Sequence, residues 1–288
     1  MKTIDRVLSA PKSAWVGNGF PVRSMFDYIA LGDEVSPFLL LDYTVPVDFE
    51  PSAIPRGVEA RAHRGFEVVT LVYQGEIEHR DSTGYTGLTG PGDVEWMTVA
   101  SGLVHEESHS TTFTRTGGRL ELVQLWVNLP AKYKTAPPSH QAILHSQIPA
   151  ASLPGASGVL RVIAGEYGGH RGPARTFSPL DVWDVHLDAG SKTTFSLPQN
   201  RRAIVVLMLG QMTLCGQITL KGVQVALLGR EDVSFSIVAH QDSTFLVLSG
   251  DPLNEPVVGA GPFVMNTVDQ ILTARRDLQN GKFGQIAR

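Results

Sequence analysis

Two short motifs indicate the architecture of this chain: RAHRGFE at residues 61–67 and GLVHEE at residues 102–107. Alternate residues of a β-strand point to the same side, so in a small barrel two residues at positions i and i+2 aim their side chains at one interior point. His105 and Glu107 form such a pair, and so do His63 and the residue two positions before it. Two imidazoles and one carboxylate form the donor set of many non-heme iron sites, which keep other positions on the metal open. The sequence therefore predicts a metal site of His63, His105 and Glu107 inside a β-barrel.

The composition is that of a globular protein and argues against several kinds of partner. The 288 residues carry a formal net charge of -4, which gives no indication of nucleic-acid binding. No apolar run reaches the length of a membrane span, and the N-terminus lacks the apolar core of a secretory signal. The single cysteine, Cys215, excludes an internal disulfide and is typical of a reducing compartment. We expect a cytoplasmic protein with no membrane and no direct nucleic-acid contact, in which the Cys215 thiol is buried and unreactive.

Short β-branched and aromatic runs, separated by glycine and proline, predict an all-β fold. The length suggests two domains, at about 150 residues per domain. The segment after residue 130 is rich in Pro, Ala and Ser, as is typical of a linker or crossover. We therefore expect an N-terminal barrel at residues 1–135, a linker at 136–158 and a C-terminal barrel at 159–288. The expected strands cover residues 38–42, 67–73, 75–80, 94–100, 120–128, 159–164, 182–187, 202–209, 222–228, 233–237 and 244–248.

The C-terminal segment departs from this pattern. Thr267 and Gln270 have the spacing of a capping box, in which the threonine hydroxyl accepts a bond from the third helical amide and the glutamine reaches back. A helix is expected from about residue 268 to 279, packed against a barrel wall. One face of this helix should carry Ile271, Leu272, Arg275 and Leu278.

The chain resembles the pirin family of two-barrel cupins over almost its whole length. The resemblance rests on long motifs in the right order, which are PFLLLD at 37–42, HRGFE at 63–67, PGDVEWMT at 91–98, GLVHEE at 102–107, QLWVNL at 124–129 and GPFVMNT at 261–267. It implies two antiparallel, jelly-roll-like cupin barrels packed face to face, with a short C-terminal α-helix folded back against them. It also implies that only the N-terminal barrel holds a metal, usually iron, through three histidines and one glutamate.

By position, the family's ligands fall on Arg61, His63, His105 and Glu107, with an arginine in place of the first histidine. A guanidinium stays protonated and offers no lone pair to a metal. In one outcome Arg61 points away, and the other three residues hold Fe(II) or another divalent metal; we favour this outcome because all three donors are retained. In the other outcome, Arg61 points inward and forms a bidentate ion pair with Glu107. Its positive charge then replaces the metal, and the barrel is metal-free. Either outcome supplies the cation that a buried carboxylate needs.

The remaining candidates are expected to be structural. We place His79 at a solvated strand end and Glu67 beside the metal site, where it orients an imidazole. The glycine-rich stretch at 87–92 precedes a strand and lacks a P-loop lysine, so a hairpin turn is expected there. No metal-ligand spacing connects the other histidines, which are His109, His140, His145, His170, His186 and His240.

The resemblance implies two kinds of function. The first is a quercetinase-like dioxygenase, in which the metal binds a flavonol through its hydroxyl and carbonyl oxygens and Glu107 takes the hydroxyl proton. The second is a non-enzymatic regulator that acts through contacts with a protein partner, with or without metal. A degenerate cupin that keeps the fold and has lost both functions is a third hypothesis.

Overall fold

The computed structural model describes residues 1–287 and consists mainly of antiparallel β-sheet. The chain folds as two compact units, each assembled from segments that are distant in sequence. The N-terminal barrel comprises Lys12–Ser24, Phe38–His145 and residues 253–287. The C-terminal barrel comprises Met1–Pro11, Met25–Pro37 and Ser146–Pro252. The domain boundaries expected from the sequence, and the packing of the two barrels against each other, stay predictions.

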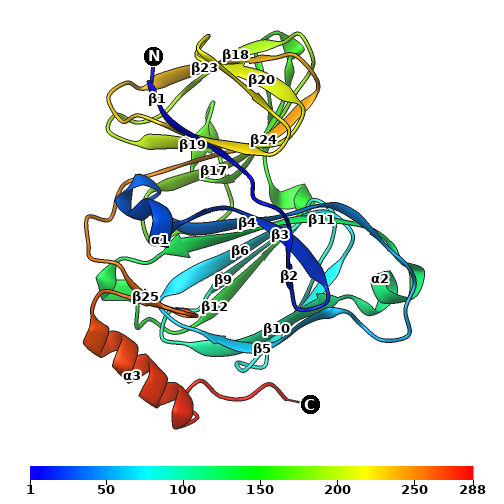
Figure 1. Cartoon of the computed structure of the whole chain (residues 1–288), viewed down its shortest axis with the longest axis vertical. Coiled ribbons are helices and arrows are strands. Elements are labelled where there is room, and N and C mark those ends of the chain that lie inside the picture. The colour runs from blue at the N-terminus through cyan, green and yellow to red at the C-terminus, as the bar shows by residue number, and fades with distance from the viewer. Residues whose placement is uncertain (288) are drawn as a thin grey trace. The chain divides into compact units, whose positions relative to one another are not determined.

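In the N-terminal barrel a seven-stranded sheet faces a four-stranded sheet (Figure 1). The larger sheet has the strand order β12 (Ser139–Ile143), β9 (Val94–Thr98), β6 (Phe66–Gln74), β11 (Gly118–Asn128), β4 (Phe38–Phe49), β3 (Phe20–Asp27) and β2 (Ala14–Val16). The smaller sheet has the order β5 (Gly57–His63), β10 (Leu103–His109), β7 (Ile77–Asp81) and β8 (Thr86–Thr89). A short helix, α2 (Thr111–Thr116), follows β10.

The C-terminal barrel repeats this layout. Its larger sheet has the order β1 (Ile4–Ser9), β22 (Gln224–Leu228), β19 (Arg202–Leu209), β24 (Ser243–Gly250), β17 (Leu180–Leu187), β14 (Gly158–Ala164) and β13 (Ala150–Ser152). Its smaller sheet has the order β18 (Lys192–Ser196), β23 (Ser234–Ala239), β20 (Gln211–Leu214) and β21 (Ile218–Lys221). The unit also contains α1 (Tyr28–Leu31) and the hairpin of β15 (Glu166–Tyr167) and β16 (His170–Arg171). Its interior is a continuous apolar core of leucine, valine and phenylalanine side chains.

The predicted all-β class with a short C-terminal helix is confirmed. Each predicted strand overlaps a strand of the structure, and β4 continues to Phe49, beyond its predicted end. The segment expected to be a crossover contains β12, which pairs with β9 and extends the larger sheet. In the glycine-rich stretch, residues 86–89 form β8, and the turn follows at residues 90–93. The thiol of Cys215 is only half-buried, because the residue occupies the turn between β20 and β21, so the prediction of a buried thiol is wrong.

The C-terminal helix α3 (Val268–Gln279) begins and ends as predicted, and both bonds of the capping box are present. Ile271 and Ala274 are buried in a small apolar cluster with Ala62 and with residues of the hairpin formed by β25 (Val258–Ala260) and β26 (Phe263–Met265). The predicted apolar face is wrong in part, because Leu272 and Leu278 are exposed.

Candidate metal centre

Strand β10 lies between β5 and β7 in the smaller sheet and carries the centre of the site. Its residues are alternately buried, so His105 and Glu107 both face the interior, as their spacing predicts. The register places Arg61 of β5 and Asp81 of β7 opposite His105, and His79 of β7 opposite Glu107. Directly opposed residues of paired strands lie on the same face. Three neighbouring strands therefore bring ionisable side chains to one interior surface.

The turn between β5 and β6 fixes the end of β5, where His63 lies. Gly65 has a φ of 95°, and a Cβ at this position would lie 2.0 Å from the carbonyl oxygen of Val264, so glycine is required. The buried ammonium of Lys134 donates to the carbonyl oxygens of Gly65 and Val264, at 2.6 Å and 3.0 Å, and to Oδ1 of Asn128 at 2.6 Å. These bonds tie the first motif to β11 and to the C-terminal hairpin.

Arg61 points into the barrel and forms an ion pair with Glu107. Its Nη2 donates to Oε2 of the carboxylate at 2.8 Å, and its side chain is 24% exposed. Nε2 of Gln124 donates to both oxygens of the same carboxylate, at 3.1 Å and 3.0 Å. The favoured expectation that Arg61 points away is therefore wrong, and the side chain has the inward orientation of the alternative, with one contact to Glu107 rather than two.

His63 and His105 are buried neighbours with ring centroids 4.8 Å apart. Burial, and secondarily the charge of Arg61, lowers the pKa of His63 to about 3. Burial also lowers the pKa of His105 well below its ordinary value. Nδ1 of His63 lies 3.4 Å from the carbonyl oxygen of Pro262, whereas neither ring nitrogen of His105 has a hydrogen-bond partner within the described residues. Both imidazoles are therefore neutral and suited to ligate a metal.

The structure groups the predicted ligands in an unexpected way. His105 and Glu107 lie with His79, and one ligand atom from each of the three residues falls within 4.8 Å of the others. His63 adjoins this group through its ring contact with His105. The set of His63, His105 and Glu107 stays a prediction. The expectation of a solvated His79 is wrong, since the side chain is 1% exposed.

The burial of His79 has a simple cause. Strand β7 is covered on both edges by β10 and β8, and its alternate residues Ile77, His79 and Asp81 face the interior. The same period-two pattern that identified His105 and Glu107 is present here, so it could have identified His79.

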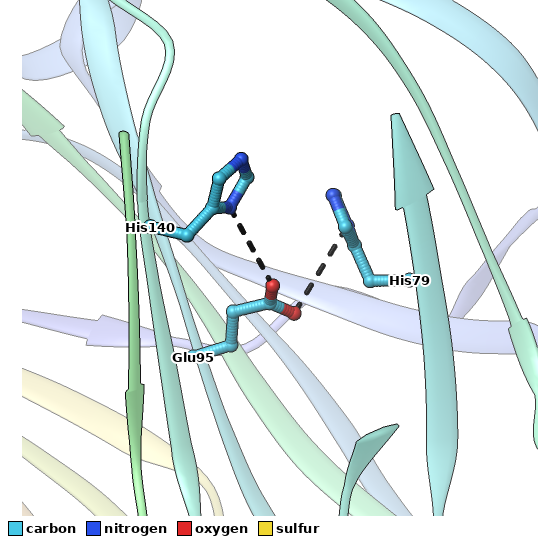
Figure 2. A group of neighbouring side chains, drawn as sticks. All are labelled: His79, Glu95 and His140. Atoms are coloured by element: carbon cyan, nitrogen blue, oxygen red, sulfur yellow. Dashed lines mark ion pairs between the residues drawn. The ribbon is translucent and has the colours of Figure 1, made fainter. Parts of the chain in front are cut away.

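A second group of ionisable side chains adjoins the first, and it contains His79, Glu95 and His140 (Figure 2). Nδ1 of His79 lies 4.0 Å from Oε2 of Glu95, and Nδ1 of His140 lies 3.8 Å from Oε1. On the other side of both rings, Oδ2 of Asp81 lies 3.2 Å from Nε2 of His79 and 2.7 Å from Nε2 of His140. His140 was expected to be unconnected to the other histidines; it reaches them because β12 pairs with β9.

The carboxylates of this group dominate its electrostatics. Burial alone would lower the pKa of His140, but Asp81 and Glu95 more than offset it and raise the pKa to about 9. Burial likewise opposes protonation of His79, whose pKa is nevertheless raised, chiefly by Asp81. Burial would raise the pKa of Asp81, but its bonds with both histidines and with Thr83 hold it well below the ordinary range. The interior thus provides a strongly negative potential beside His79 and His140.

Glu67 lies on β6 and is 1% exposed. Its Oε1 accepts a hydrogen bond from the hydroxyl of Thr98 at 2.8 Å, so the expectation that it orients an imidazole is wrong. Burial raises the pKa of Glu67 to about 7, against the smaller opposing effect of its bond with Thr98. Among the described residues, the side-chain hydrogen bond of this carboxyl is with Thr98 and not with a candidate ligand.

Two facing antiparallel sheets around an interior of histidine and carboxylate side chains define a protein of the cupin class. Residues 19–127 match the family model for pirin, and residues 182–284 match the model for the pirin C-terminal cupin domain. The chain belongs to the pirin family, which confirms the resemblance seen in its motifs. Among residues 1–287, no helix has the length and apolar character needed to cross a membrane.

Relatives cover the whole chain. A provisionally named quercetin 2,3-dioxygenase of Pseudomonas aeruginosa is 52% identical over 98% of this chain and 99% of its own length. A pirin-like protein of Solanum lycopersicum is 36% identical over 93% of this chain and 88% of its own length. A crystal structure of a quercetin 2,3-dioxygenase from Acinetobacter baumannii superposes with a TM-score of 0.98, at 48% sequence identity and with full coverage of both chains.

Proposed function

We propose that this pirin is a metal-dependent dioxygenase of flavonol-type substrates, with its metal held by His63, His105 and Glu107. The names of the Pseudomonas and Acinetobacter relatives support this class of reaction. The observation that carries the proposal is His105, a fully buried imidazole whose two ring nitrogens lack partners within the described chain. Leaving a buried polar group unpaired costs about 1–3 kcal/mol, and a divalent cation would remove that cost.

The residues present fit such an ion. Two neutral imidazoles and a carboxylate suit Fe(II), which we propose as the metal, and three protein ligands leave positions open for substrate. When bound, the metal supplies Lewis acidity to the substrate oxygens and redox chemistry for dioxygen.

The roles of the protein side chains follow from their contacts. Glu107 accepts the proton of the flavonol hydroxyl. Gln124 donates to both oxygens of this carboxylate and so fixes its orientation. The guanidinium of Arg61, 2.8 Å from the same carboxylate, supplies positive charge that stabilises the anion left after proton transfer.

To test this function, the protein is loaded with iron under anaerobic conditions, and air and quercetin are then added. Quercetin consumption with release of carbon monoxide is expected from the native protein. At matched iron occupancy, Glu107→Gln should lower kcat by about 10²–10⁴-fold, because it removes the proton acceptor. The control is His186→Ala, which removes an exposed histidine of the C-terminal barrel and should leave turnover unchanged. Absence of turnover at full iron occupancy would overturn the enzymatic proposal and favour a regulatory role through a protein partner.

A further inference from the structure

The group of His79, Glu95 and His140 contains a gap bounded by three possible donors. Figure 2 shows the Glu95 carboxylate between the two imidazoles, with one oxygen toward each ring. The separations from Nδ1 to oxygen, 4.0 Å for His79 and 3.8 Å for His140, are too long for hydrogen bonds. Two donors bound tetrahedrally to one zinc-sized ion lie about 3.4 Å apart, so a movement of about half an ångström would close each gap around a cation.

Two of the atoms that face this gap lack other partners. Oε1 of Glu95 and Nδ1 of His140 are buried without an aligned hydrogen bond in the described part of the chain. The side chains of Glu95 and His140 are 4% and 9% exposed. Unpartnered polar atoms this deeply buried call for a ligand.

Asp81 lies where a residue that orients metal-bound histidines would lie. Its Oδ2 faces Nε2 of both His79 and His140, and its Oδ1 is held by the backbone amide and hydroxyl of Thr83. A metal-bound imidazole usually directs its second nitrogen at a carboxylate, which fixes the tautomer and the ring orientation. Here one carboxylate performs this role for two imidazoles, so that both Nδ1 atoms face Glu95. Tyr85 stacks on His140 with ring centroids 4.0 Å apart and limits its movement further.

We propose that His79, His140 and Glu95 form a second divalent-cation site in the N-terminal barrel, with Asp81 as the residue that positions both histidines. The donor set of two imidazoles and one carboxylate selects a transition-metal ion such as Zn(II), Fe(II) or Co(II) over Ca(II) or Mg(II). One ligand comes from each of β7, β9 and β12, so the ion would link the smaller sheet to the edge of the larger one.

Cobalt binding tests this site without relying on turnover. Co(II) titrated into the metal-free His105→Ala variant, in which the first centre is disabled, should bind at about one equivalent per chain and give visible absorption bands. Introducing Glu95→Gln into the His105→Ala variant keeps the shape of the side chain and removes its charge. This second substitution should abolish cobalt binding. Asp81→Asn should retain the site with a Kd about 10–100-fold higher. His186→Ala serves as the control for loss of a histidine outside the N-terminal barrel.

Two results would overturn the second site. One is a His105→Ala protein that binds no cobalt while its circular dichroism matches that of the native chain. The other is cobalt binding that is unchanged by Glu95→Gln. Neither result bears on quercetin turnover at the first centre, so the two proposals fail separately.

Discussion

The two barrels have the same arrangement of sheets and opposite kinds of interior. In the C-terminal barrel, the second strand of the smaller sheet is β23, which buries Phe235 and Ile237 at alternate positions. In the N-terminal barrel the second strand of the smaller sheet is β10, which buries His105 and Glu107 at alternate positions. Burying ionisable groups costs free energy, and the compared positions of the C-terminal barrel carry apolar side chains instead. Folding of this layout therefore does not by itself require His105 and Glu107 at these positions.

The largest effect on stability is expected in the apolar barrel. Phe235 stacks on Phe195 with ring centroids 5.3 Å apart, and both rings are fully buried. Phe235→Ala should lower the free energy of unfolding by about 3–5 kcal/mol, because it leaves a cavity. His105→Ala in metal-free protein should cost much less, since it also removes two unpartnered polar atoms. Urea denaturation of both variants checks this contrast, and equal losses would remove the distinction between the two interiors.

The next effect is a gain of stability in the polar barrel. The folded pKa of Glu67, about 7, exceeds its ordinary value of 4.5, so its ionisation destabilises the fold increasingly as pH rises from 4.5 to 7. Glu67→Gln removes that penalty and keeps an oxygen to accept from Thr98. The variant should be more stable than the native chain by up to about 3 kcal/mol at pH 8, and by much less at pH 5. Urea denaturation at the two pH values measures the difference, and a gain independent of pH would contradict the assigned cause.

A smaller effect tests whether a metal ion can supply the positive charge that Arg61 gives to Glu107. Arg61→Met should destabilise the metal-free protein by about 1–2 kcal/mol, a figure reduced by the partial exposure of the ion pair with Glu107. Loading with Fe(II) should restore the lost stability, because the ion supplies the missing positive charge. Thermal unfolding with and without metal measures both changes.

The matched control for Arg61 is Arg80, which pairs with Glu106 across the outer face of the same sheet. Arg80→Met should change stability by less than about 1 kcal/mol and should not respond to metal. If both arginine variants respond alike, Arg61 has no special relation to the metal.

Much of the fold was predictable from local signals. Glycine and proline residues between the apolar runs indicated where strands begin and end. The spacing of Thr267 and Gln270 predicted the start of α3 within one residue. The sequence did not predict that residues 1–11 belong to the C-terminal barrel and residues 253–287 to the N-terminal barrel. This assignment depends on pairing between distant segments, such as that of β1 with β22. Strand β12 was not predictable either, since Ile143 is its one β-branched residue and the strand forms through pairing with β9.

The candidate centre was predictable only in part, for the same reason. Alternate side chains of a strand point to the same side, and this predicted that His105 and Glu107 lie together on one strand. His79, Glu95 and His140 lie on three strands, and only tertiary structure brings them together. The direction of Arg61 depends on the competition between solvent and the Glu107 carboxylate, which sequence spacing does not describe.

Metal content is the most direct test of the view that the N-terminal barrel is the binding half of the molecule. Inductively coupled plasma mass spectrometry on Co(II)-loaded, desalted protein should give about two ions per native chain. A variant combining His105→Ala with Glu95→Gln should retain none, because both groups of possible ligands found among the described residues lie in the N-terminal barrel. A native chain without metal, or a double variant that keeps the native stoichiometry, would contradict this account.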